Sequence, residues 1–406
     1  MNLDTPATVL LGILLVVLSG FGVAIVARHQ HVSLWVATPV ILWPSGNVYV
    51  QAPIIGILAL GTLIGSRSRL RETRKPILLF LGFAIVMTLG LIFHGVPMTV
   101  TPDEQRNSFI AMLLSVSVIP IVALQRTPLL TTLKVVALSS ALISVYILIT
   151  YQVVGGRVSS ETHNSDAIGL AAALGILTSI GALILTRKFR WFLVSIPSIA
   201  LFVEAQTRAA LVILGVGLLL LWLFHNASPT RIAIAILVLA AAPFLPDLVL
   251  AMERALFSQR DTQYLEVQSR VDVLLLAGRL IVENPISGIG WRHFTDESLQ
   301  TIGVVINAHN DYALIGAEGG MVALALLAGL VLRSVTFRDP TAGGHVLRAL
   351  AIAAAAALLF GNLITDLRVT WVIWILLGIA WSSQRSKTAH PSAFDRGRRA
   401  SSILQR

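Results

Sequence analysis

The chain contains no cysteine, so neither a disulfide nor a thiolate contributes to its fold or its chemistry. Charged residues are also scarce, because Asp, Glu, Lys and Arg make up only 12% of the 406 residues. Soluble domains contain roughly 25% charged residues, so this composition excludes an ordinary soluble enzyme. Apolar runs of roughly 17–25 residues, the length that crosses a bilayer, recur along most of the chain. We therefore expect an all-α polytopic membrane protein.

Hydropathy predicts about twelve transmembrane helices and one shorter apolar segment. The segment 32–43 covers only about half a bilayer, so it is predicted to be re-entrant or tilted. The N-terminus reads Met-Asn-Leu-Asp without a basic region, which predicts a retained first helix and not a cleaved signal. The predicted spans lie near 6–27, 48–65, 76–94, 108–124, 129–153, 166–186, 191–206, 208–225, 231–250, 312–332, 345–363 and 367–382.

Basic residues predict the sidedness of the loops. They gather in RSRLRETRK (67–75), in RKFR (187–190), after the span 312–332, and in the tail. An even number of predicted spans separates these clusters, so all of them, and both termini, can face the cytoplasm. The net charge of +10 is therefore a topology signal and does not indicate a nucleic-acid partner.

Four parts follow from this topology. Residues 1–250 form an N-terminal bundle, 251–311 a large periplasmic loop, 312–382 the C-terminal transmembrane helices, and 383–406 a basic cytoplasmic tail. Loops of such length tend to carry function.

The long loop contains a predicted helix at 265–283 that stops at Asn284-Pro285. Arg279 and Glu283 are four residues apart and predict a pair on a solvated stripe. Glu266 and Arg270 lie on a second stripe with apolar flanks, where the arginine needs an anion. A Glu266–Arg270 salt bridge and a bound ligand explain this second stripe equally well.

Three further polar clusters are predicted on the same membrane side. EAQTR (204–208) contains Glu204 and Arg208, GNLITDLR (361–368) contains Asp366 and Arg368, and NAHNDYALIGAEGG (307–320) contains His309. Charges beside a membrane segment mark function or a structural ion pair, and a histidine at a helix end is often only a cap. Neighbouring guanidinium groups would keep the imidazole neutral, and arginines suit phosphate oxygens. Together these groups predict group transfer from a phosphorylated donor.

The order of these motifs resembles the C-terminal signature of the O-antigen ligase and polymerase superfamily. That signature has an arginine, an Asn-Pro turn with two glycines, a His-Asn pair followed by an aromatic residue, and a nearby Glu-x-Gly. The matching stretches are SR (269–270), ENPISGIGWRHF (283–294) and AHNDYALIGAEGG (308–320), and Thr207-Arg208 is similar to an upstream arginine element. The resemblance is close over about 200–380, and the earlier half matches only as a hydropathy profile.

The resemblance implies a C-type glycosyltransferase-like fold and an O-antigen ligase at the periplasmic face of the bacterial inner membrane. Such an enzyme moves a glycan from undecaprenyl pyrophosphate to a sugar of lipid A-core, with inversion and without a metal or another cofactor. Carried over by position, His309 would be the base, and Arg208 and Arg270 would hold the donor pyrophosphate. Asp366, Glu204 and Asn310 would be supporting residues.

Two acidic features could suggest other roles. The pair Asp103-Glu104 could suggest a metal, but a solvated turn explains it better. Glu318 and its neighbouring glycines fit close helix packing as well as catalysis. His163-Asn164 is interpreted as a polar loop pair.

Other functions remain open at this point. An O-antigen polymerase and a protein O-oligosaccharyltransferase carry the same signature, and the absence of a C-terminal domain argues mildly against the latter. A lipid-linked glycan transporter is the alternative from another class. Transporters often show repeats and midplane charges, whereas here no repeat is visible and the polar clusters are predicted at one face.

Overall fold

The computed structural model describes residue 19 and residues 22–42, 48–71, 73–151, 153–154, 157–158, 165–205, 207–225 and 263–383. Several predictions concern parts outside these residues. They are the span 231–250, most of the span 6–27, the tail beyond Ser383, the pair His163-Asn164 and the side chain of Glu266.

The described chain is helical apart from one short hairpin. Strands β1 (Val153–Val154) and β2 (Arg157–Val158) pair antiparallel. The helices are α2 (Gln30–Leu42), α3 (Val48–Gly65), η1 (Arg67–Arg69), α4 (Arg74–His94), α5 (Pro102–Gln125), α6 (Leu129–Thr150), α7 (Ser165–Thr186), α8 (Arg190–Ala205), α9 (Arg208–His225), α12 (Gln263–Glu283), α13 (Phe294–Ile302), α14 (Asp311–Val335), α15 (Ala342–Ala357) and α16 (Leu367–Ser383).

Five of these helices are long and apolar enough to cross a membrane, namely α4, α5, α6, α7 and α14. Five others are apolar but shorter: α2, α3, α9, α15 and α16. The chain is therefore a helical membrane protein, as the composition predicts, and the total of twelve spans stays a prediction.

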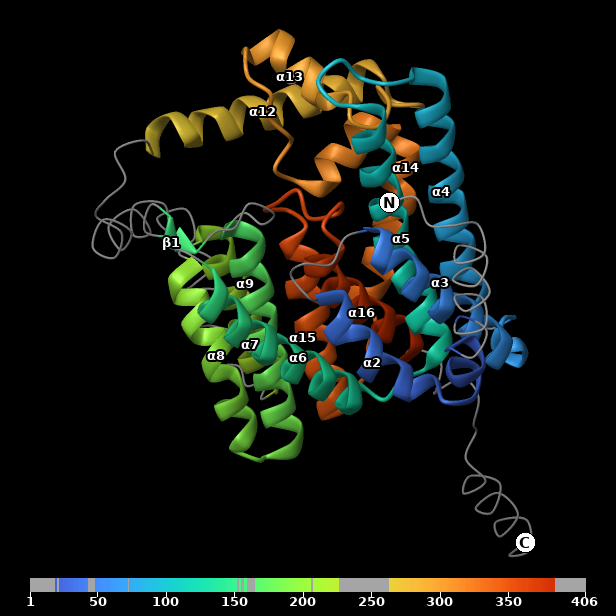
Figure 1. Ribbon diagram of the computed structural model, residues 1–406, viewed down its shortest axis with the longest axis vertical. Helices are drawn as coiled ribbons and strands as arrows, with labels where there is room; N and C mark the ends of the chain where they lie inside the picture. The colour runs from blue at the N-terminus through green and yellow to red at the C-terminus, as the bar shows by residue number, and fades with distance from the viewer. Residues whose placement is uncertain are drawn as a thin grey trace, which may run out of the picture.

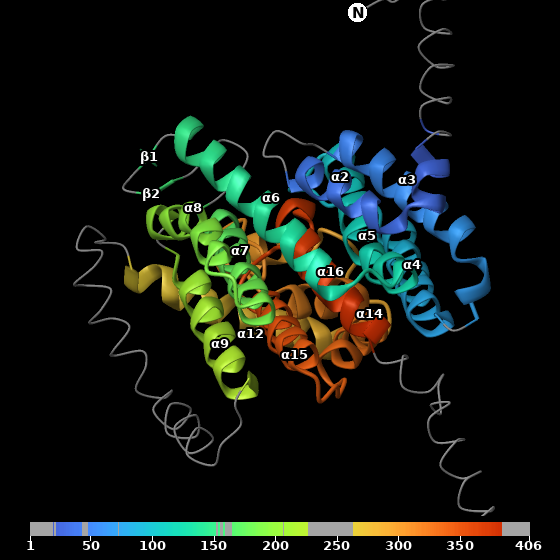
Figure 2. The same ribbon diagram turned by 90° about the horizontal axis from the view of Figure 1, so that it is seen from below.

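Helix α16 forms the centre of the bundle. It packs against α5, α15, α14, α2 and α7, and Trp371 and Trp374 on it are fully buried. The N-terminal helices α2–α5 flank it on one side and α6–α9 on the other (Figures 1 and 2). A helix buried on all sides explains why this part of the sequence is apolar throughout, without a polar stripe.

The observed helices agree closely with the predicted spans, with two differences. The predicted segment 32–43 is the 13-residue helix α2, which contains Pro39. The predicted span 345–363 is wrong at its end, because α15 stops at Ala357 and the chain then forms a turn up to α16. Thr341 caps the start of α15 by accepting a hydrogen bond from the Gly344 N–H.

The helix predicted at 265–283 is confirmed as α12, and it ends immediately before Asn284-Pro285 because proline cannot continue a helix. The Arg279–Glu283 pair is also confirmed, with Nε and Oε1 2.8 Å apart on an exposed surface. The sequence did not predict α13, which follows after a short turn. Figure 1 shows α12 and α13 together at one end of the molecule, with α12 running across the direction of α4.

Helix α14 is broken in its middle at Gly320, whose backbone angles are φ 75° and ψ 177°. The break removes helical hydrogen bonds at a position buried within the protein, where water does not replace them. The segment after α12 replaces one of them, because the Met321 N–H donates to the Pro285 carbonyl over 2.7 Å.

The glycine turn 288–290 provides hydrogen-bond donors for carbonyl groups on the N-terminal side of this break. The N–H groups of Ile289 and Gly290 donate to the carbonyls of Ala317 and Glu318 over 2.9 and 3.0 Å. Gly288 has φ 64° and Gly290 has φ 95°, and a side chain at Gly288 would collide with the Glu318 backbone. The Asn-Pro–glycine motif and the Glu-Gly-Gly motif are therefore two halves of one backbone interface.

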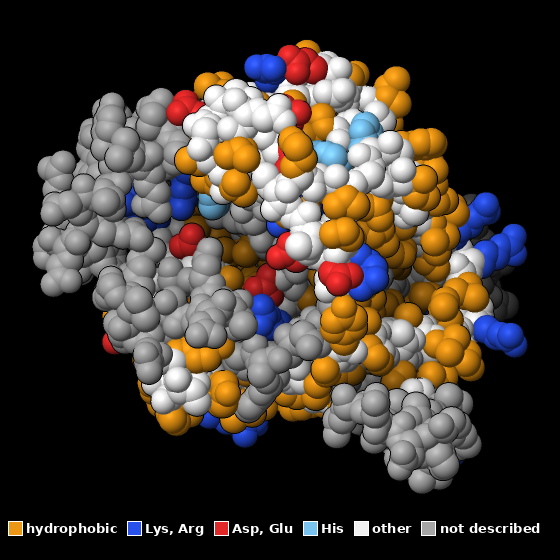
Figure 3. All heavy atoms as spheres, turned by 45° about the horizontal axis from the view of Figure 1, so that its top comes forward, with side chains coloured by type: hydrophobic (Ala, Val, Ile, Leu, Met, Phe, Trp, Pro, Cys, Tyr) orange, Lys and Arg blue, Asp and Glu red, His pale blue; other side chains and the backbone are white. Residues whose placement is uncertain are grey.

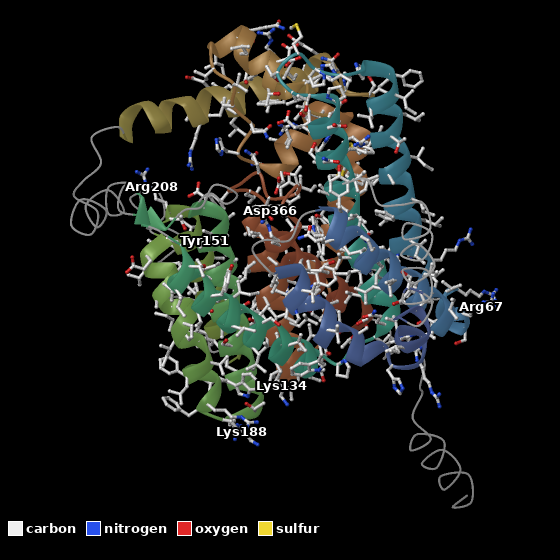
Figure 4. All side chains as sticks on the ribbon, in the orientation of Figure 1. Arg67, Lys134, Tyr151, Lys188, Arg208 and Asp366 are labelled. Atoms are coloured by element: carbon white, nitrogen blue, oxygen red, sulfur yellow. The ribbon has the colours of Figure 1, made fainter. Side chains whose placement is uncertain are left out.

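Opposite ends of the molecule differ in character. Figure 3 looks obliquely onto the end formed by α12 and α13 and shows acidic, basic and histidine side chains around a hollow. Figure 4 shows Arg208 and Asp366 toward this end, whereas Arg67, Lys134 and Lys188 lie toward the other. Residues that the sequence predicts on one membrane side therefore lie at one end of the bundle. We refer to the two as the polar-site end and the basic end.

We expect Gly320→Ala to destabilise the protein by about 2 kcal/mol, because alanine tolerates a positive φ poorly and its Cβ would collide with the Ile286 carbonyl. Gly329→Ala in the same helix is the control, since its Cβ would meet Leu79 at an ordinary 3.6 Å. Thermal melting of the purified variants measures the difference, and equal melting temperatures would contradict the role given to Gly320.

The absence of cysteine allows a clean test of sidedness. Glu283→Cys lies on α12 and Lys188→Cys lies at the basic end, and both positions are exposed. A membrane-impermeant maleimide should label Glu283→Cys in cells with a permeabilised outer membrane, and Lys188→Cys only after the inner membrane is disrupted. The opposite pattern, or labelling of both in intact spheroplasts, would overturn the predicted orientation.

Candidate functional site

His309 lies immediately before α14 and is held by the turn between α15 and α16. Its N–H donates to Asn362 Oδ1 over 3.0 Å, and its φ of 49° is left-handed, which is uncommon for a residue with a side chain. The next residue, Asn310, caps α14 by accepting a hydrogen bond from the Ala313 N–H. Backbone geometry therefore fixes the point from which the imidazole projects.

Asp311 fastens this point to the same turn. Its fully buried carboxylate accepts hydrogen bonds from the Leu363 and Ile364 N–H groups, both over 3.1 Å. Its own N–H donates to the Leu358 carbonyl over 2.8 Å. A carboxylate that accepts two N–H groups also satisfies backbone donors that the turn would otherwise leave unpaired.

Asp366 and Arg368 form an ion pair at the end of this turn. Arg368 Nε lies 3.0 Å from Asp366 Oδ1, and both side chains are about four-fifths buried, with exposures of 18% and 19%. The Asp366 carboxylate also accepts the Arg368 N–H over 3.1 Å. The turn that holds His309 thus also carries a partly buried guanidinium.

Arg270 on α12 extends to the first turn of α7. Its Nη2 lies 3.9 Å from Asp166 Oδ2, and the side chains are 41% and 28% exposed. The sequence did not suggest Asp166 as a neighbour of Arg270, and the side chain of Glu266 lies outside the described residues. At this distance and exposure the pair of Arg270 and Asp166 contributes little stability.

Arg208 begins α9 beside the same part of α7. The preceding residue, Thr207, is buried, and its hydroxyl fills the space where a side chain at Gly169 would lie. Gly169 stands one turn after Asp166, so the missing Cβ brings the start of α9 close to the start of α7. Glu204 is exposed in the last turn of α8.

One cavity links these two regions. It encloses about 510 Å³ including its open side and is lined mainly by apolar residues of α6, α7 and α16. Ala167, next to Asp166, and Arg368, next to the His309-holding turn, both line it. The cavity therefore extends from the first turn of α7, next to Asp166, to the first turn of α16, next to the turn that holds His309. Figure 4 shows Arg208 and Asp366 at similar height in the bundle.

Glu318 has a structural contact of its own. Its Oε1 accepts the Phe294 N–H at the start of α13 over 3.2 Å, and the side chain is 1% exposed. The glycines beside it form the backbone interface with the 288–290 turn. The packing interpretation of this motif therefore has direct support from the structure.

The loop before α5 joins the same end through Asp296 of α13. Burial alone would raise the pKa of Asp296, but hydrogen bonds from the Thr99 hydroxyl and from the Met98 and Thr99 N–H groups outweigh it and lower the pKa. In the same loop, Thr101 and Glu104 form a capping box at the start of α5. Asp103 is 77% exposed and pairs with Arg106 at 2.9 Å. Asp103 and Glu104 are thus cap and surface residues.

Three contributors were not predicted from the sequence: Asn362, Asp166 and Gly169. In addition, Asp311 was recognised only as part of a polar cluster. A polar residue inside an otherwise apolar turn, as Asn362 is in GNLITDLR, is the one local signal that could have indicated a role. Among the described residues, no group of three His, Asp or Glu side chains is placed to hold a metal ion.

These features define a multi-pass helical membrane protein with a polar site at one end of its bundle. A family model described as O-antigen ligase matches residues 192–328, from α8 into α14. Over these residues the chain is similar to the O-antigen ligases, a family of glycosyltransferase-like enzymes, in agreement with the resemblance found in the sequence. It includes Arg208, Arg270 and His309 and ends before Asp366. No curated protein matches the chain.

We expect Asp311→Asn to destabilise the protein by about 2 kcal/mol, because the amide nitrogen would face one of the two buried N–H donors. Asp103→Asn is the control, since Asp103 lies on the surface. Melting temperatures of both variants test this, and an unchanged value for Asp311→Asn would show that its carboxylate does not hold the turn.

Proposed function

We propose that the protein is an O-antigen ligase. It transfers a glycan from undecaprenyl pyrophosphate to a sugar hydroxyl of lipid A-core at the periplasmic face of the bacterial inner membrane. One observation carries this proposal: Arg270 and the start of α9 both lie against the start of α7, and the cavity beside it reaches Arg368 in the first turn of α16, next to the turn that holds His309.

Arg208 and Arg270 bind the donor pyrophosphate in this proposal. Guanidinium groups suit phosphate oxygens because they donate paired hydrogen bonds and remain charged. Arg270 is 41% exposed and lies 3.9 Å from Asp166, a contact that contributes little stability. The arginines neutralise the leaving group in the manner that a metal does in other transferases, so the proposed reaction needs no cofactor.

His309 acts as the general base. The imidazole removes the proton from the acceptor hydroxyl as that oxygen attacks the anomeric carbon of the donor. The bond from this carbon to the pyrophosphate oxygen breaks, and undecaprenyl pyrophosphate leaves with the electron pair. A single in-line displacement inverts the anomeric centre. The hydrogen bond to Asn362 and the cap at Asn310 orient the segment from which the imidazole projects.

Asp366 supports the site by holding Arg368. Its carboxylate accepts hydrogen bonds from the backbone N–H and from the side-chain Nε–H of Arg368. These bonds orient the side chain of Arg368, a residue that lines the cavity. Glu204 is exposed at the end of α8, and we give it no part in the transfer step.

A comparison of two arginines on α12 tests the proposal. With purified protein, undecaprenyl-pyrophosphate-linked glycan and lipid A-core, Arg270→Ala should lower kcat/KM by roughly a hundredfold, because two charge-assisted hydrogen bonds are lost. Arg279→Ala should change kcat/KM by less than about threefold, since its pair with Glu283 is exposed.

Equal losses for Arg270→Ala and Arg279→Ala would contradict the pyrophosphate site. If the wild type instead elongates the lipid-linked glycan and leaves lipid A-core unmodified, the protein is a polymerase. Movement of the intact donor across proteoliposomes without transfer would identify a transporter.

A further inference from the structure

A second polar pocket lies at the basic end of the molecule, away from the proposed transfer site. It encloses about 1030 Å³ including its open mouth, between the start of α2, η1 and the connection from α5 to α6. Arg28, Arg69 and Arg126 contribute to its walls, and none of the described residues that line it is acidic. Three arginines from three separate parts of the chain thus line one hollow.

Gln125, which lines this pocket, carries a buried hydrogen-bond acceptor without a partner among the described residues. The side chain is only 5% exposed, and its Nε2 donates to Thr62 Oγ1 over 2.9 Å and to Ser33 Oγ over 3.4 Å. Ser33 must accept here, because its own hydroxyl proton is donated to the Gln30 carbonyl. The amide orientation is therefore fixed, and Oε1 has no hydrogen-bond partner within the described part of the chain.

Thr127 adds a second such atom. It is 4% exposed, it lines the same pocket, and its Oγ1 has no partner among the described residues. Between these two residues, Arg126 adopts a left-handed backbone with φ 51°, a conformation that costs roughly 1 kcal/mol for a residue with a side chain. Buried polar atoms without partners are costly in a finished protein. A ligand that reaches both atoms would remove this cost.

We propose that Arg28, Arg69 and Arg126, together with Gln125 and Thr127, bind a phosphate group that carries a hydroxyl. The guanidinium groups receive the phosphate oxygens. The hydroxyl donates to Gln125 Oε1, and Thr127 Oγ1 supplies the remaining hydrogen-bonding group. Two sources offer this chemistry: the headgroup of an anionic lipid such as phosphatidylglycerol, and soluble hydrogenphosphate or a phosphate monoester. The site does not depend on the proposed transfer reaction.

Two binding assays on the full chain distinguish the sources. In the lipid assay, the protein is reconstituted in phosphatidylcholine nanodiscs containing phosphatidylglycerol, and retained lipid is counted by native mass spectrometry. In the soluble assay, thermal melting is followed in phosphatidylcholine nanodiscs with inorganic phosphate against chloride at equal ionic strength. Binding in either assay supports the proposal and identifies the source.

The variants are Arg69→Gln, Arg126→Asn and Thr127→Val, with Arg67→Gln as the matched control. Arg67 and Arg69 belong to the same short helix η1, but Arg67 does not line the pocket and points away from the bundle in Figure 4. Asparagine tolerates the left-handed backbone at position 126. Arg69→Gln and Arg126→Asn should each weaken binding about tenfold, Thr127→Val less, and Arg67→Gln by less than about twofold.

Size-exclusion profiles and melting temperatures establish that each variant is folded before binding is compared. The proposal is overturned if the wild type binds in neither assay, because the pocket then holds solvent alone. It is equally overturned if Arg67→Gln weakens binding as much as Arg69→Gln does, since the basic end would then attract anions only by its overall charge.

Discussion

Backbone groups that leave a helix inside a membrane protein must find partners within the protein, because hydrocarbon offers none. Helix α14 meets this constraint twice. At Gly320 the helix breaks, and the segment 285–290 supplies the hydrogen bonds that the break removes. At its start, Asp311 accepts the N–H groups of the turn that precedes α16. These two connections fix where α12 leaves the bundle and where His309 stands.

The polar site follows from these connections. The turn held by Asp311 carries Asn362, which receives the His309 N–H, and it also carries the Asp366–Arg368 pair. On the other side of the shared cavity, α12 places Arg270 beside the first turn of α7. A histidine whose backbone is held by hydrogen bonds and arginines that are partly exposed suit transfer chemistry, since the base must be positioned before the acceptor arrives and the arginines must meet a charged donor.

The sequence predicts the positions of most of the described apolar helices well, because the bilayer imposes both length and composition on its spans. It also predicts α12, its stop at Asn284-Pro285 and the exposed Arg279–Glu283 pair, all of which depend on local spacing. It does not predict α13, the partnership of Arg270 with Asp166, or the contact between Thr207 and Gly169. These depend on which helices become neighbours, and contacts between residues far apart in the sequence leave no periodic signal. The roles of His309, Arg208, Arg270 and Asp366 remain predictions that the geometry supports.

The most direct test of this account is a lipopolysaccharide gel from a ligase-deficient host that expresses the wild type or His309→Ala at matched membrane levels. The account predicts a ladder of glycan-capped bands for the wild type and none for His309→Ala. A ladder of equal intensity from His309→Ala would contradict the assignment of the base. A wild type that forms no capped product, even with purified cognate donor and acceptor, would contradict ligation itself.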